Sequence, residues 1–87
     1  MSNINVEITI PKSLGKSSQL VLDKPEPILE IIKKNLEKIV LDRILAKDGT
    51  FNRYVLVYLN GKRVKDGMTL LNEQKSEIDI IIPMAGG

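Results

Sequence analysis

The sequence predicts the α+β fold class, with a mixed sheet of four or five strands packed on one main helix. Three observations lead to this prediction. Residues 4–10 alternate apolar and polar side chains, as a half-buried strand does. Between residues 28 and 40 the apolar side chains recur at steps of three and four, which is typical of an amphipathic helix. The stretches 53–59 and 78–82 are short and rich in β-branched or aromatic residues, as strands are.

The first strand and the next one are expected to form a hairpin. Pro11 ends the alternating run, and the turn-rich stretch 12–18 contains Gly15. Leu20 to Leu22 then form a short apolar run that favours a second strand. The two strands are close enough in the chain to pair with each other.

The helix is expected to begin after Pro25 and Pro27 and to run from residue 28 to about residue 40. The apolar pattern continues beyond that point, which predicts a kink or turn near Val40 to Asp42. The expected apolar stripe consists of Ile28, Leu29, Ile32, Leu36, Ile39, Val40 and Ile44.

The stretch 53–59 is apolar on both faces and is expected to be a central strand. Asn60 and Gly61 follow it, and Asn-Gly between such runs predicts a type I′ turn because both residues accept positive φ. Val64 therefore lies on a short returning strand.

The final strand is expected at residues 78–82, after an irregular stretch that Leu70 and Leu71 anchor in the core. Alternation assigns Ile78, Ile80 and Ile82 to the core, and Asp79 and Ile81 to the opposite face. The first and last strands are both patterned for a core, so we expect them to lie side by side and parallel in the sheet centre. That arrangement is the β-grasp, or ubiquitin-like, fold, with a domain at residues 1–82 and a flexible Gly-Gly tail at residues 83–87.

The composition excludes several kinds of site. The sequence contains no cysteine and no histidine, so it offers neither a thiolate nucleophile nor the commonest general base and metal ligand. The 13 basic residues are interleaved with 11 acidic ones and only 3% of residues are aromatic, which argues against a nucleic-acid partner. The first residues suggest neither a signal peptide nor a membrane span. We therefore expect a cytoplasmic protein without a metal or cofactor.

The carboxyl-terminal segment carries a family resemblance. A strand ending in IIIP is followed by MAGG, and it is preceded by VYLNGKRV and an Asp-Gly turn. This pattern resembles the MoaD/ThiS-type sulfur carriers, the related small archaeal modifier proteins and the eukaryotic ubiquitin-related modifier. The stretch LLNEQKSEIDI departs from the family pattern, because it lacks the Gly-Asp pair that often leads into the last strand.

The resemblance implies that an E1-like partner enzyme uses ATP to adenylate the carboxylate of Gly87. The adenylate then accepts sulfur to become a thiocarboxylate, or it passes to a thiol or amine. Glycine suits positions 86 and 87 because a backbone without side chains enters a narrow phosphate-lined channel most easily. The partner would supply all catalytic groups, so this chain is expected to be a carrier and not an enzyme.

Three functions stay open at this point. The first is a sulfur carrier for molybdopterin, thiamine or tRNA thiolation, which hands sulfur to an accepting enzyme. The second is a ubiquitin-like modifier joined through Gly87 to lysines of target proteins, with Lys62 and Lys65 as attachment points for a second copy. The third is a plain interaction module, for which Gly86 and Gly87 are only a frayed terminus.

A docking surface for the partner is expected beside the tail. Either Tyr54, Leu56 and Tyr58 or the alternate residues Val55, Val57 and Leu59 must face outward. We favour the tyrosine set, because an exposed tyrosine hydroxyl needs no protein partner. The predicted partner-binding residues are Leu56, Tyr58, Ile81, Met84 and Ala85. The alternative is a second small cluster that the loop 65–76 covers.

Overall fold

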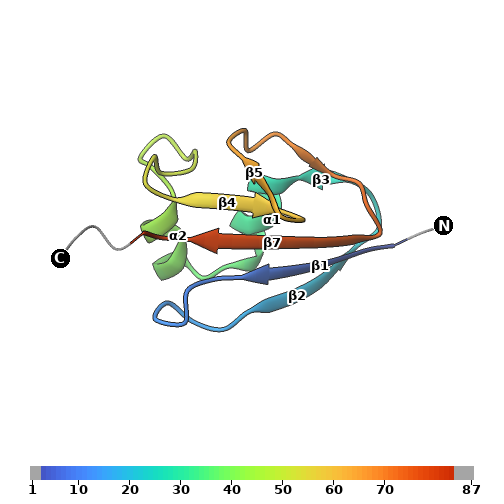
Figure 1. Ribbon diagram of the computed structural model, residues 1–87, viewed down its shortest axis with the longest axis horizontal. Helices are drawn as coiled ribbons and strands as arrows, with labels where there is room; N and C mark the ends of the chain where they lie inside the picture. The colour runs from blue at the N-terminus through green and yellow to red at the C-terminus, as the bar shows by residue number, and fades with distance from the viewer. Residues whose placement is uncertain (1–2, 84–87) are drawn as a thin grey trace.

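The computed structural model describes residues 3–83 and consists of one five-stranded sheet, one two-stranded sheet and two short helices (Figure 1). The larger sheet has the strand order β2-β1-β7-β4-β5, and β3 pairs with β6 in the smaller one. The elements are β1 (Ile4–Thr9), β2 (Ser18–Leu22), β3 (Glu26–Pro27), α1 (Ile28–Asn35), α2 (Lys38–Ile44), β4 (Leu56–Leu59), β5 (Lys62–Val64), β6 (Leu70–Leu71) and β7 (Lys75–Ile81).

The centre of the sheet is the parallel pair of β1 and β7, as the sequence predicts. Ile8 lies opposite Ile78 in this pair. On the far side of β1, β2 is antiparallel, with Ile4 opposite Leu22, which confirms the first hairpin. On the far side of β7, β4 is antiparallel as well, so β7 has a hydrogen-bonded neighbour along both edges.

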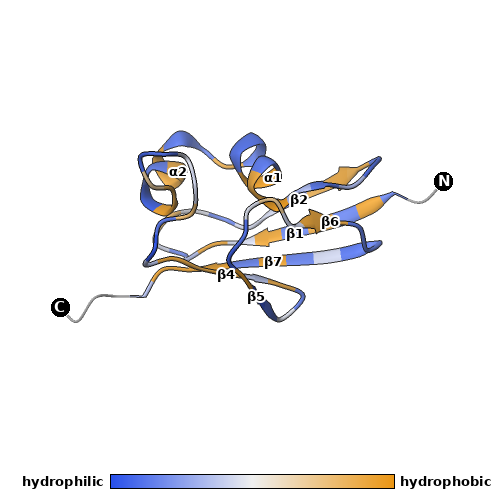
Figure 2. Cartoon of the chain, turned by 90° about the horizontal axis from the view of Figure 1, so that it is seen from above, coloured by the Kyte–Doolittle hydropathy of each residue, from blue (hydrophilic) through white to orange (hydrophobic). Residues whose placement is uncertain are grey.

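The two helices cover one face of the sheet and leave the other face to solvent (Figure 2). Between the helices and the sheet lies a single core built mainly from aliphatic side chains. Its fully buried members are Ile8, Ile28, Ile31, Ile32, Ile44, Val57, Leu71 and Ile78. Ile82 packs partly buried against this core. The inward assignment of Ile78 and Ile80 is confirmed, since both are buried.

The helical layer differs from the prediction of one main helix with a turn near residues 40–42. The chain leaves the helical conformation earlier, at Leu36 and Glu37, which have extended backbones with ψ of 150° and 154°. The Asn35 side chain promotes this break, because its Nδ2 donates to the carbonyl oxygen of Ile31 at 2.8 Å and competes with the helical backbone.

Because of the break, α2 turns a different set of side chains to the core than a continuous helix would. Val40 and Ile44 of α2 are buried, while Ile39 is 67% exposed. Assigning Ile39 to the apolar stripe was wrong because the stripe assumed continuous helical periodicity across residues 36–37. Ile31 takes a buried place that the stripe did not include.

β4 is shorter than the predicted strand 53–59. The side chain of Asn52 accepts a hydrogen bond from the backbone N–H of Tyr54 at 3.1 Å, and the N–H of Val55 donates to the carbonyl of Asn52 at 2.9 Å. These bonds make a turn of residues 52–55, and pairing begins only at Leu56. The predicted parity nevertheless holds: Val55 and Val57 are buried, and Tyr54 is 69% exposed.

The chain after β4 follows the predicted turn and then departs from the prediction in detail. Asn60 and Gly61 have φ of 51° and 84°, which confirms the positive-φ turn between β4 and β5. Leu71 is fully buried, but Leu70 is 52% exposed, so only one of the two expected anchors enters the core. The two residues alternate on the short strand β6, and consecutive strand residues point to opposite faces.

Candidate functional site

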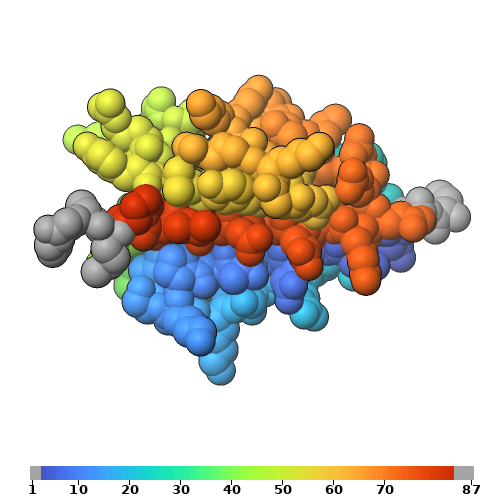
Figure 3. All heavy atoms as spheres, in the orientation of Figure 1, coloured from blue at the N-terminus to red at the C-terminus, as the bar shows by residue number. Residues whose placement is uncertain are grey.

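The outer face of the sheet, turned away from the helices, brings three of the predicted partner-binding residues together. Leu56 of β4 lies directly opposite Ile81 of β7, and Tyr58 lies one pleat further along, opposite Asp79. We call Leu56, Tyr58 and Ile81 the outer patch. Figure 3 shows this face, on which β7 crosses the centre between β1 on one side and β4 on the other.

The outer patch is open to solvent. Ile81 is 46% exposed, while Leu56 and Tyr58 are half-buried. Tyr58, Asp79 and Ile81 also line a shallow hollow, to which Thr9 and Lys12 contribute from β1 and the turn after it. The patch therefore combines apolar surface with one carboxylate.

The loop 65–76 does not lie over the outer patch. The backbone N–H of Leu29 donates to the carbonyl of Gly67 at 3.0 Å, and that of Ile28 donates to the carbonyl of Thr69 at 2.8 Å. These bonds hold the loop against the first turn of α1, on the helical side of the sheet. The alternative of a loop-covered cluster is therefore wrong.

The outer patch lies beside the point where the chain leaves the sheet. β7 ends at Ile81, two residues before the exposed Pro83. Because β7 runs parallel to β1, this exit is at the end of the sheet opposite to the start of β1 (Figure 1). The other predicted site residues, namely Met84, Ala85, Gly86 and Gly87, lie outside the described residues, and their roles stay predictions.

Two further residues that the sequence assigns to the outer face, Tyr54 and Asp79, were not singled out as binding residues. Tyr54 is exposed in the turn of residues 52–55 that precedes β4, and the Arg53 guanidinium lies 5.8 Å from the centre of its ring. Asp79 was assigned to the outer face, but its position opposite Tyr58 depends on the strand register. The two-residue period assigned both residues to the outer face, whereas no local signal in the sequence reports that Asp79 lies opposite Tyr58.

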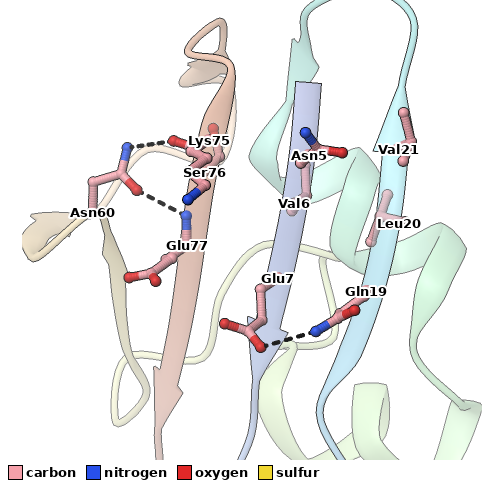
Figure 4. A pocket seen from close by; sticks show the side chains of 10 residues that line it. All are labelled: Asn5, Val6, Glu7, Gln19, Leu20, Val21, Asn60, Lys75, Ser76 and Glu77. Atoms are coloured by element: carbon pink, nitrogen blue, oxygen red, sulfur yellow. Dashed lines mark hydrogen bonds between the residues drawn. The ribbon is translucent and has the colours of Figure 1, made fainter. Parts of the chain in front are cut away.

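The opposite half of the outer face is polar and contains the hydrogen bonds that hold the start of β7 (Figure 4). The Asn60 side chain accepts a bond from the Glu77 N–H at 2.8 Å and donates to the carboxylate of Glu73 at 2.9 Å. Its backbone N–H donates to the carbonyl of Glu77 at 2.8 Å. The Asn-Gly turn thus ties the β4-β5 hairpin to the strand that leads to the tail.

The Asn60 contacts give a stability prediction. Asn60→Gly removes the side-chain hydrogen bonds but keeps a residue that tolerates positive φ, so we expect a loss of about 1 kcal/mol in the free energy of unfolding. Asn60→Ala removes the same bonds and adds the cost of a left-handed backbone, about 1 kcal/mol more. Urea denaturation of the three proteins measures both effects. Equal stability of the two variants would show that the positive φ at residue 60 is not strained in alanine.

Lys62 and Lys65 are both exposed. Neither forms a side-chain ion pair within residues 3–83. Their accessibility suits attachment of a second copy, but it does not distinguish them from other surface lysines.

Residues 3–83 offer no cluster of three or more acidic side chains that could hold a metal ion. Within the same range, neither helix has the length and apolar character needed to cross a bilayer.

The fold has solved counterparts. SAMP1 from Haloferax volcanii superposes with a TM-score of 0.77 at 16% sequence identity, covering 95% of this chain and 99% of the other. The HVO 2177 protein from the same organism gives 0.72 at 24% identity, covering 99% and 89%. The chain has the β-grasp fold. At the level of fold, the resemblance to small archaeal modifier-like, ubiquitin-related proteins is confirmed.

A more distant counterpart is At2g32350 from Arabidopsis thaliana, with a TM-score of 0.57 at 21% identity and coverage of 99% and 93%. No protein-family model matches the sequence, and no curated protein matches it either. The likeness therefore lies in the arrangement of helices and strands, while the sequences have diverged widely.

Proposed function

We propose that this protein is a ubiquitin-like sulfur carrier whose Gly87 carboxylate is adenylated by an E1-like enzyme and converted to a thiocarboxylate. One observation carries the proposal. The central strand β7 leads directly to the exit at Pro83, and its last outward residue, Ile81, forms the outer patch together with Leu56. A partner that docks on the outer patch is therefore adjacent to the segment that ends in Gly86 and Gly87.

The chemistry needs no reactive side chain from this protein. A carboxylate oxygen of Gly87 attacks the α-phosphate of ATP, and pyrophosphate leaves. A hydrosulfide ion from a sulfide donor then attacks the acyl carbon, AMP leaves, and loss of the S–H proton gives the thiocarboxylate. The partner enzyme binds ATP and aligns the reacting atoms, which is the main source of catalysis in such a step. This division of labour suits a chain that lacks both cysteine and histidine.

The remaining parts of the proposal follow from this role. The protein acts as a substrate and carrier and not as an enzyme. Its partners are the E1-like enzyme, which uses ATP, and the enzyme that accepts the sulfur. We place these events in the cytoplasm and propose no nucleic-acid or membrane partner and no cofactor of its own.

A second candidate is a protein modifier joined through Gly87 to target lysines. The fold likeness to SAMP1, a small archaeal modifier protein, favours it. The two candidates share every step up to the adenylate and differ in the nucleophile that follows. In the modifier, a lysine amine attacks the adenylate in place of the sulfur nucleophile, which forms an amide bond and releases AMP.

Intact-mass spectrometry tests both candidates. Protein ending at Gly87 is incubated with the E1-like enzyme of the same organism, ATP and a sulfide donor. We expect a gain in mass equal to the replacement of one oxygen by one sulfur. Tryptic digests of cell extract are searched in parallel for target lysines that carry residues 76–87 as a branched remnant, because the last Lys or Arg of this chain is Lys75. Remnants on lysines without the gain in mass would favour the modifier. The absence of both signals would contradict both candidates.

The outer patch gives a separate prediction. In the double variant Leu56→Ser/Ile81→Ser we expect the KM of adenylation for this protein to rise about 10-fold or more, because apolar docking surface is lost. The matched control is Val21→Ser, which removes a side chain that is 59% exposed on the outer face of β2, away from the outer patch. ATP–pyrophosphate exchange measures the rate. Equal effects of the variant and the control would rule out the outer patch as the docking surface.

A further inference from the structure

Asp79 is a charged residue within the outer patch that the packing of the fold does not explain. It lies on the central strand, with Tyr58 directly opposite on β4 and Thr9 opposite on β1. The next outward residue of the same strand is Ile81. Asp79 is half-buried, and aspartate is depleted in strands because it packs poorly on a pleated surface.

Within residues 3–83, no basic side chain forms a salt bridge with Asp79. The ion pairs of this part of the chain are Lys34–Glu26 and Lys38–Asp42. The nearest basic residue along the same row is Arg63, which lies opposite Tyr58 on β5, with Tyr58 between it and Asp79. Lys12 lines the same hollow but is not within salt-bridge distance. If a partner covered this surface without supplying a cation, the carboxylate would lose its water and cost free energy.

The neighbours of Asp79 favour a guanidinium group over an ammonium group. A carboxylate binds the two parallel N–H donors of arginine, and the adjacent tyrosine ring offers a flat face for the same planar group. Tyr58 and Asp79 are directly opposite each other in the β4-β7 pair and their side chains leave the same face of the sheet, so one partner side chain can reach both. Leu56 and Ile81 would exclude water around the pair on docking and strengthen it.

We propose that the outer patch binds an arginine of the E1-like adenylating enzyme, whose guanidinium pairs with Asp79 and stacks on Tyr58. This assignment rests on the proposed function, and it makes Asp79 the residue that selects the partner. An enzyme without an arginine at that position would leave the Asp79 charge buried and unpaired, so it would bind poorly.

The test is the Kd of the wild-type protein and its variants for the purified E1-like enzyme, measured without ATP by calorimetry. We expect Asp79→Asn to raise the Kd about 10-fold or more, since an isosteric amide leaves the arginine unpaired. The control is Glu77→Gln, which removes the same charge from the same face one pleat earlier on β7 and should change the Kd by less than about twofold. Thermal unfolding verifies that both variants fold.

Two further measurements address the stacking and the arginine. Tyr58→Phe keeps the ring and should leave the Kd within about twofold, whereas Tyr58→Leu should raise it about fivefold. Treating the enzyme with phenylglyoxal, which modifies arginine, should weaken its binding to the wild-type protein more than its binding to Asp79→Asn. If phenylglyoxal weakened the binding of the wild-type protein and of Asp79→Asn equally, or if the two Tyr58 variants had equal effects on the Kd, the proposed arginine contact would be wrong.

The outcomes separate this assignment from the proposed function. If the wild-type protein binds the enzyme and Asp79→Asn binds equally well, or if Glu77→Gln weakens binding as much, the assignment is wrong and the carrier function stands. If the wild-type protein neither binds nor is adenylated, the proposed function fails, and the assignment fails with it.

Discussion

Removal of Gly87 is expected to lower the rate of adenylation about 100-fold or more and to leave the free energy of unfolding unchanged. A chain that ends at Gly86 still carries a carboxylate, but that carboxylate lies about 3.5 Å further from the α-phosphate when the domain is docked. Misplacement of a reacting group by even about 1 Å can cost a factor of roughly 100. The described core ends at Ile82 and a glycine has no side chain to bury, so we expect the deletion to leave the stability of the domain unchanged.

ATP–pyrophosphate exchange with the E1-like enzyme measures this effect, and urea denaturation measures stability. The matched control adds one glycine after Gly87, which preserves the composition of the tail and displaces the carboxylate in the other direction. We expect the extended protein to be impaired as well. Undiminished exchange by the shortened protein would contradict the proposal that Gly87 is the reactive residue.

Ile78→Ala is expected to lower the free energy of unfolding by about 3 to 4 kcal/mol. Ile78 is fully buried on the central strand, where it lies opposite Ile8 of β1 and Leu59 of β4. The substitution removes apolar contacts and leaves a cavity among side chains from both neighbouring strands. A domain of this size has a total stability of roughly 4 to 13 kcal/mol, so the loss is a large part of it.

Urea denaturation at constant temperature measures this loss. Ile81→Ala is the matched control, because it makes the same chemical change on the same strand at a residue that is 46% exposed. We expect the control to lose less than about 1 kcal/mol. A loss in Ile78→Ala as small as that in Ile81→Ala would mean that β7 is not the centre of the core. Together with the Gly87 deletion, this pair separates the stability of the scaffold from the chemistry of the tail.

The faces of the strands could be predicted from the sequence because alternation is a local property. In β7 it correctly assigned Ile78 and Ile80 to the core and Ile81 to the outer face. The turn at Asn60 and Gly61 was predictable for a similar reason, since positive φ is tolerated by few residue types. The final Gly86 and Gly87 could be read as a candidate reactive tail from the sequence alone, and their role stays a prediction.

The helical layer could not be predicted in the same way. The apolar period passes through residues 36–37 without interruption, and the break there depends on the Asn35 side chain and on how Val40 and Ile44 reach the core. The exposure of Leu70 likewise follows from the pairing of β6 with β3, two segments that are far apart in the chain. Contacts between distant segments leave no local pattern, so these features were missed.

By itself, the sequence determined which side of each main strand faces the core, where the β4-β5 hairpin turns, and that the candidate reactive group is a backbone carboxylate. These properties depend on a residue and its near neighbours in the chain. Only the tertiary structure decided that Asp79 lies against Tyr58 and that Leu56 meets Ile81 beside the exit of the tail. Those contacts depend on the register between β4 and β7, and a shift of one residue would have turned the same side chains to the opposite face.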